Sequence, residues 1–308
     1  MSTLPATSSQ GSHLGRILVI ALHAFTQLVR MKVFYFLAVF GVIAIASNFF
    51  DLPQHEGPES LGVNVLRSIK SWSLGTMTLF SVVLSIVATA LLLPKDVEDR
   101  TLYTILAKPV PRFDSLAGKL LGVLMLVFVS LALMDGLMTL VLHIRTGMVL
   151  DQQLAMAAAL DWPQDAIDSL RKETEAHGVN WSLQGAVFAV FLRASIMASL
   201  ALLISTFSTS TLFTTIVSFL IYFIGHFQAD ARDVYLQAGA AGEGVFGRLL
   251  SLLLSLVMPD FQNFNVIDAV IEGQALPLLI LGKLTLIGLY YAVFFTIASW
   301  FIFAEKEF

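Results

Sequence analysis

Two long stretches of the sequence contain no Asp, Glu, Lys or Arg. Residues 71–94, SWSLGTMTLFSVVLSIVATALLLP, form the first stretch, and residues 194–229 form the second. The hydrocarbon core of a bilayer is about 30 Å thick and needs about 20 apolar helical residues, and buried helices of soluble proteins are rarely uncharged for that long. Only 13% of the residues are charged, against about 25% in soluble domains. We therefore expect an integral membrane protein.

Apolar runs predict six transmembrane helices in one domain at 33–308. Since lipid offers the backbone no hydrogen-bond partner, each span is expected to be an α-helix, and no alternating pattern indicates a β-barrel. The expected fold class is an all-α integral membrane protein. A further apolar run at 249–259 has about half the length needed to cross, so we expect an interfacial or re-entrant helix there. The six predicted spans are 33–50, 73–93, 117–142, 183–206, 211–228 and 277–303.

The residues before the first span predict a tail and a surface helix. Residues 1–15 are polar and are expected to form a disordered cytoplasmic tail. Residues 16–32, RILVIALHAFTQLVRMK, place His23, Gln27 and Arg30 on one stripe at helical spacing. This pattern predicts an amphipathic interfacial helix at the inner membrane surface. It would serve either as a membrane anchor or as a docking site for a partner.

Basic residues are concentrated on one side of the predicted membrane domain. The segment before the first span contains Arg16, Arg30 and Lys32, and the C-terminal tail contains Lys306. Basic residues mark cytoplasmic loops, so both termini are expected in the cytoplasm. In the segments on the other side, basic residues are spread over more chain and outnumbered by Asp and Glu. The same cytoplasmic side receives Lys95, Arg100, Lys108, Arg112 and Lys119 from the connection between the second and third spans.

Two segments, 143–182 and 229–276, are predicted to lie on the outer side. The first contains DWPQDAIDSLRKETEAHG, in which Asp161 could cap a polar helix, Pro163 would lie in its first turn and Gly178 would end it. The two segments are too short to form an independent catalytic domain.

The sequence contains no motif for nucleotide, metal or covalent chemistry. Gly118-Lys119 does not form a phosphate-binding loop, because Phe113 stands where the first glycine would be and Leu120 follows the lysine. There is no cysteine, and the six histidines are scattered. We therefore expect no catalytic residue, no metal site, no cofactor and no nucleic-acid partner for this chain.

Besides Lys119 at the start of the third span, three side chains of Asp, Lys or Arg lie inside predicted spans, where they are costly and therefore candidates for function. Asp135 and Arg193 differ in predicted depth by only about 5 Å, at 1.5 Å of rise per residue. They are expected to form an intramembrane polar pair, which either fixes helix packing or contacts a substrate. Lys283 is expected to extend to the outer interface. No series of such groups crosses the membrane, which disfavours a proton-coupled secondary transporter.

Residues 98–122, EDRTLYTILAKPVPRFDSLAGKLLG, cover most of the connection between the second and third spans, at 94–117, and the start of the third span. This segment resembles the corresponding loop of type-2 ATP-binding-cassette (ABC) permeases. Four other segments are similar in the same order: LVRMKVFY, ALLISTFSTS, LVMPDFQNFNV and AEKEF. The resemblance is greatest to six-span bacterial permeases labelled as multi-copper enzyme maturation components, although no copper site is visible here. The resemblance rests on Glu98, Arg100, Thr101, Leu102, Leu106, Lys108, Pro109, Arg112, Gly118 and Lys119.

The resemblance implies a permease subunit of an ABC exporter in the bacterial inner membrane. Such permeases are dimers, here expected to be a homodimer, and each copy binds a separate cytoplasmic ATPase that holds ATP and Mg. The loop between the second and third spans is implied to be the coupling helix that contacts the ATPase. An alternative is an ATPase-driven scaffold that acts on an accessory protein at the outer face. The candidate coupling residues are Asp96, Val97, Glu98, Arg100, Thr101, Leu102, Ile105, Leu106, Lys108, Pro109 and Arg112.

Overall fold

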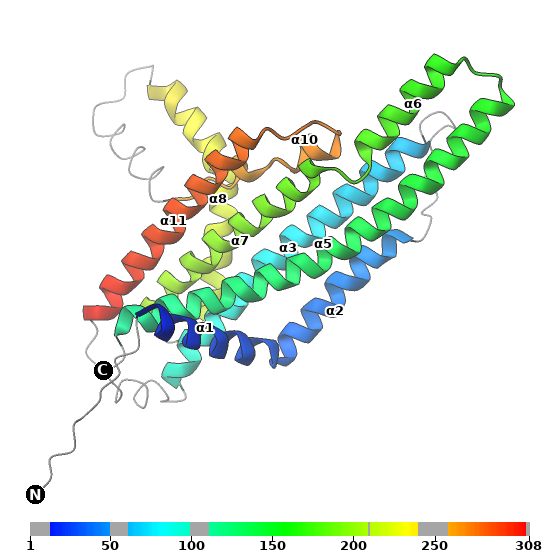
Figure 1. Cartoon of the computed structure of the whole chain (residues 1–308). Coiled ribbons are helices and arrows are strands. Elements are labelled where there is room, and N and C mark those ends of the chain that lie inside the picture. The colour runs from blue at the N-terminus through cyan, green and yellow to red at the C-terminus, as the bar shows by residue number, and fades with distance from the viewer. Residues whose placement is uncertain (1–12, 50–60, 99–110, 209, 240–257, 306–308) are drawn as a thin grey trace, which may run out of the picture.

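The computed structural model describes residues 13–49, 61–98, 111–208, 210–239 and 258–305 (Figure 1). Over these ranges the chain is helical and contains no strand, which confirms the all-α prediction. The elements are α1 (His13–Val29), α2 (Lys32–Ala46), η1 (Ser47–Phe49), α3 (Leu61–Glu98), α5 (Arg112–Ala159), α6 (Gln164–His177), α7 (Trp181–Phe207), α8 (Thr211–Gly239), η2 (Gln262–Phe264), α10 (Ile267–Ile271) and α11 (Leu278–Glu305).

Among the described residues, four helical segments are long and apolar enough to cross a membrane. They lie in α3, in α5, in the stretch that contains α7, and in α11. The apolar parts of α2 and α8, Leu37–Ala46 and Thr211–Phe227, are shorter than a full span. The described part of the chain is therefore helical, with four helical segments that could cross a membrane, and the arrangement with six spans stays a prediction.

The long helices alternate in direction along the chain (Figure 1). Helix α1, the first turns of α5 and the last turn of α11 lie together at one end, which we call the terminal end. Helices α6 and α10 and the first turns of α3 lie at the other end, which we call the distal end (Figure 1). Both described ends of the chain, His13 and Glu305, are therefore on the same side of the bundle.

Helix α7 forms the centre of the bundle and packs against α3 and α11, while α3 also packs against α5. Nearly all of the α7 side chains between Ala189 and Thr206 are buried. Many of them are alanine or serine, which lets neighbouring helix backbones approach closely. The serine hydroxyls are satisfied within the helix: Ser195 donates to the carbonyl of Phe191, and Ser199 to that of Ile196.

Several helix boundaries differ from the predicted spans. Helix α5 is a single helix of 48 residues and continues well past the predicted end at 142. The predicted polar helix is present as α6, and Gly178 follows its last residue as expected. The predicted cap is wrong, because Pro163 occupies the N-cap position. Asp161 instead has a positive φ of 48° in the turn between α5 and α6.

Candidate functional site

Four of the predicted coupling residues flank the connection between α3 and α5. Asp96, Val97 and Glu98 form the last turn of α3, and Arg112 is the first residue of α5. The first three of the predicted coupling residues thus belong to α3. The other candidates lie outside the described residues: Arg100, Thr101, Leu102, Ile105, Leu106, Lys108 and Pro109.

Arg112 connects the start of α5 to the end of α11. Its Nη1 donates hydrogen bonds to the carbonyl oxygens of Phe303 at 2.9 Å and Ala304 at 2.8 Å. The guanidinium carbon also lies 5.9 Å from the centre of the Phe303 ring. The last carbonyls of a helix have no partner within the helix and carry a partial negative charge, so a cation there satisfies and stabilises them. One predicted residue therefore has a described role, which is to hold two helices together beside the charged connection.

Asp114 connects the same part of α5 to α1. Its carboxylate is almost fully buried and accepts a hydrogen bond from Arg16 Nε at 3.0 Å. The Nδ1 atom of His13 lies 3.2 Å from both oxygens of this carboxylate. A carboxylate in the first turn of a helix also interacts favourably with the helix dipole. The pattern of basic residues was recognised in the sequence, but the role of Asp114 as their acceptor was not.

Two glycines allow α1 to lie directly against α5. A Cβ atom on Gly118 would lie 2.7 Å from Cβ of Ile20. One on Gly122 would lie 2.7 Å from Cβ of Ala24 and 2.8 Å from the carbonyl oxygen of Ala21. This is the close approach that a Gly-x-x-x-Gly spacing permits between helices. This contact was not predicted, although the glycine spacing on α5 and the alanines of α1 are signals for it in the sequence.

The predicted pair of Asp135 and Arg193 is not formed in the structure. Asp135 on α5 accepts a hydrogen bond from Gln184 Nε2 at 3.3 Å. Arg193 on α7 is almost fully buried, and its Nη2 donates to the carbonyl oxygen of Phe261 at 3.2 Å. The two residues meet different neighbours. The prediction of an ion pair is therefore corrected to two separate polar contacts.

Arg193 lies beside a short segment, 258–266, that packs between helices. Its guanidinium is close enough to Tyr222 of α8 for the two side chains to interact, and its Nε has no hydrogen-bond partner. The ring of Tyr222 lies 5.4 Å from that of Phe261, measured between ring centres. The hydrogen bond from Arg193 and the ring contact with Tyr222 together fix the position of Phe261.

Hydrogen bonds to backbone carbonyl oxygens hold the 258–266 segment to α8 and α11. The Phe261 N–H donates to the carbonyl of Gly225 at 3.2 Å, and a Cβ on Gly225 would lie 2.6 Å from the Phe261 ring. The Gln262 side chain donates to the carbonyl of His226 at 2.8 Å. The Tyr291 hydroxyl donates to the carbonyl of Met258 at 3.1 Å. In the sequence this segment belongs to the predicted outer segment 229–276 and to the family resemblance, and neither predicts these contacts.

Of the apolar run predicted at 249–259, only the last two residues belong to the described part, so this prediction falls outside the structure. Lys283, expected to reach the outer interface, is exposed near the distal start of α11.

Within the described residues, no group of three or more His, Asp or Glu is placed to hold a metal ion. No protein-family model and no curated protein matches the chain. Its function is therefore inferred from the contacts above.

Proposed function

We propose that this chain is the permease subunit of an ABC exporter of the type-2 class and works as a homodimer with a separate cytoplasmic ATPase. One observation carries the proposal. Helices α3 and α5, of 38 and 48 residues, both meet the charged connection at the terminal end and continue unbroken to the distal end. An ATPase that moves this connection would therefore move helices that extend through the whole bundle, as a rigid-body transition requires.

The contacts at the terminal end support the same interpretation. Arg112 joins the start of α5 to α11, and Asp114 joins it to α1. Because these contacts fix the direction in which α5 leaves the connection, a displacement of the connection is transmitted to packed helices. The resemblance described from the sequence supplies the class of partner, a cytoplasmic ATPase that binds ATP and Mg.

The proposed topology has six spans, with both termini in the cytoplasm of a bacterium. The alternating helix directions and the common position of His13 and Glu305 support an even number of crossings (Figure 1). Exposed Trp72 and Trp181 lie near the distal parts of α3 and α7, and tryptophan is enriched at membrane interfaces.

Reporter fusions test this topology. Fusions at residue 100, in the connection, and at residue 165, in α6, are expected on opposite sides of the inner membrane. A reporter active only in the cytoplasm should give signal at 100, and one active only in the periplasm should give signal at 165. Signal on the same side at both positions would contradict an odd number of crossings between them.

Charge reversal in the connection tests the coupling. We expect Glu98→Lys combined with Arg100→Glu to reduce complex formation and permease-stimulated ATP hydrolysis at least about tenfold, because reversed charges oppose their partners across an interface. ATP turnover is measured with the purified permease and its candidate ATPase.

The matched control reverses an equally spaced, exposed pair at the distal end, Arg171→Glu with Glu173→Lys on α6. This variant should retain complex formation and turnover. Equal turnover in the connection variant and the control would reject the coupling role.

A further inference from the structure

His177 joins three elements at the distal end, where α6, α10 and the first turns of α3 lie together (Figure 1). Its side chain is buried, and its Nε2 accepts a hydrogen bond from Nε of Arg67 on α3 at 3.2 Å. The same ring lies against Gly273, which follows α10 and has a positive φ of 80°. A Cβ on Gly273 would lie 3.1 Å from both Cε1 and Nε2 of the ring. His177 therefore holds the end of α6 to α3 and to the turn after α10.

The hydrogen bonds of His177 determine which ring nitrogen carries the proton. Nδ1 lies 3.0 Å from the carbonyl oxygen of Glu173, which can only accept, so the proton is on Nδ1. The guanidinium of Arg67 can only donate, so Nε2 must offer its lone pair. Only the neutral imidazole meets both conditions. A second proton, on Nε2, would point at the N–H group of Arg67 and place two cations side by side.

The charged side chains closest to this contact are also positive. Lys70, one turn after Arg67 on α3, is fully buried, and its charge is close enough to be repelled by that of Arg67. The Lys70 Nζ donates to the carbonyl oxygen of Val270 on α10 at 3.4 Å. On α5, Arg145 precedes Thr146, whose side chain lies beside the residue that follows His177. A proton added to His177 would therefore increase the positive charge of a region that is already basic.

The nearby carboxylates do not balance this charge. On α10 and in the turn after it, Asp268 accepts from the Asn265 side chain and Glu272 from that of Gln274. The charged side chains of α6 are all exposed, and so is Asp151 of α5. In the part of the chain that the structure describes, no Asp or Glu forms an ion pair with His177.

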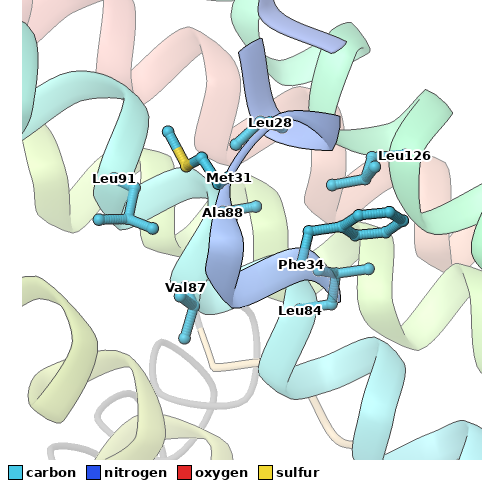
Figure 2. Close-up of a pocket in the computed structure, with 8 residues that line it drawn as sticks. All are labelled: Leu28, Met31, Phe34, Leu84, Val87, Ala88, Leu91 and Leu126. Atoms are coloured by element: carbon cyan, nitrogen blue, oxygen red, sulfur yellow. The ribbon is translucent and has the colours of Figure 1, made fainter. Parts of the chain in front are cut away.

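The joint between α1 and α2 offers no comparable contact. Its lining side chains, which include Leu28, Phe34 and Leu84, are all apolar and carry no titratable group (Figure 2). Apolar packing depends on the area removed from water and not on protonation. A change of pH is therefore expected to act on the contact of α6 and to leave this joint as it is.

We propose that His177 is a pH switch that holds the end of α6 to α3 when its ring is neutral and releases it when the ring is protonated. Histidine is the side chain that changes charge between about pH 5 and 8. Since the contact accommodates only the neutral ring, it is complete at the upper end of this range and lost as the pH falls. Thr174 still donates to Gln153 of α5 at 2.8 Å, so the released α6 stays attached to α5. Under the proposed topology α6 lies on the outer side, where the pH follows that of the surroundings.

A distance between two spin labels tests the switch in the full-length, detergent-purified protein. The chain has no cysteine, so Ser71→Cys on α3 and Ser169→Cys on α6, both at exposed positions, provide the two labelling sites. Pulsed electron paramagnetic resonance gives the distribution of distances between them. We expect a single distance at about pH 8 and a longer distance as the major component at about pH 5. The same distribution at both values would overturn the switch.

Substitutions of His177 separate the switch from a general effect of acid. His177→Gln keeps a side-chain acceptor for Arg67 but cannot be protonated, so the short distance should persist at the lower pH. His177→Lys carries a positive charge throughout, so the longer distance should be present already at the higher pH. His143→Gln is the matched control, because His143 is an exposed histidine on α5. This variant should respond to pH as the labelled parent does.

A response of His177→Gln equal to that of the labelled parent would assign the pH effect to another group. A short distance in His177→Lys at the higher pH would show that a cation is tolerated there, and it would also overturn the proposal. These measurements use the permease alone. Failure of the ATPase to bind would leave them standing, so the two proposals can fail separately.

Discussion

Replacing Gly122 by valine separates α1 from α5 and lowers the thermal unfolding midpoint of the detergent-solubilised protein. The atoms nearest to a new Cβ on Gly122 include the carbonyl oxygen of Ala21 at 2.8 Å and the backbone nitrogen of Phe25 at 3.2 Å. These are backbone atoms of a helix, so they cannot rotate away as the end of a flexible side chain could. We expect a cost near the upper end of the range for overpacking, about 3 kcal/mol. A midpoint decrease of several degrees follows.

The matched control for this prediction is Gly136→Val, also within α5. A Cβ on Gly136 would meet no atom within 4 Å, and the change in helix propensity is the same. Because the chain has no cysteine, Leu28→Cys provides a single labelling site on α1, and Leu28 is only 2% exposed. Its reaction with a maleimide should accelerate in the Gly122→Val background and not in the Gly136→Val background. Equal midpoints and equal labelling rates in the two backgrounds would show that the glycine contact does not hold α1.

Replacing Gly225 by valine displaces the 258–266 segment from α8. The new side chain would overlap the ring of Phe261 at 2.6 Å and the carbonyl oxygen of Pro259 at 2.8 Å. Phe261 is fully buried, and its backbone is bonded to both Gly225 and Arg193, so it has no free direction in which to move. We expect these hydrogen bonds to break and the local opening free energy to fall by about 2 kcal/mol.

Hydrogen exchange of peptides that cover residues 258–266 measures this change. A loss of about 2 kcal/mol corresponds to exchange that is roughly 30-fold faster. Gly282→Val on α11 is the control, because a Cβ at Gly282 would meet no atom within 4 Å and the position is exposed. Unchanged exchange in the Gly225→Val protein would mean that this segment is held by other contacts.

Apolar run length predicted where the central helices lie but not how far they extend. The predicted spans 183–206 and 277–303 differ by only a few residues from α7 and α11, since both helices are bounded by residues that end an apolar run. Helix α5 continues beyond its predicted span because LDQQLAMAAA, although partly polar, favours a helix. The hydrophobic criterion finds the membrane part of such a helix, and helix propensity sets its actual end.

Pairing inside the membrane could not be predicted from depth alone. Similar depth brought Asp135 and Arg193 together in the prediction, but a helix side chain also has a direction around the helix axis. That direction leads Asp135 to Gln184 and Arg193 to the carbonyl of Phe261. The carbonyl partner belongs to an irregular segment whose position depends on three helices. Sequence periodicity within a single helix carries no information about such a segment.

The length of α5 has a mechanical consequence. Its 48 residues extend about 72 Å, more than twice the thickness of a hydrocarbon core of about 30 Å. Arg112 and Asp114 fix its first turn to α11 and α1, which makes that end a natural pivot. A tilt of only about 5° around this pivot would move the far end by about 6 Å, as simple geometry gives for a rod of that length. Rotations small enough to preserve the packing of the bundle are therefore amplified into displacements as large as a side chain where α5 meets α6.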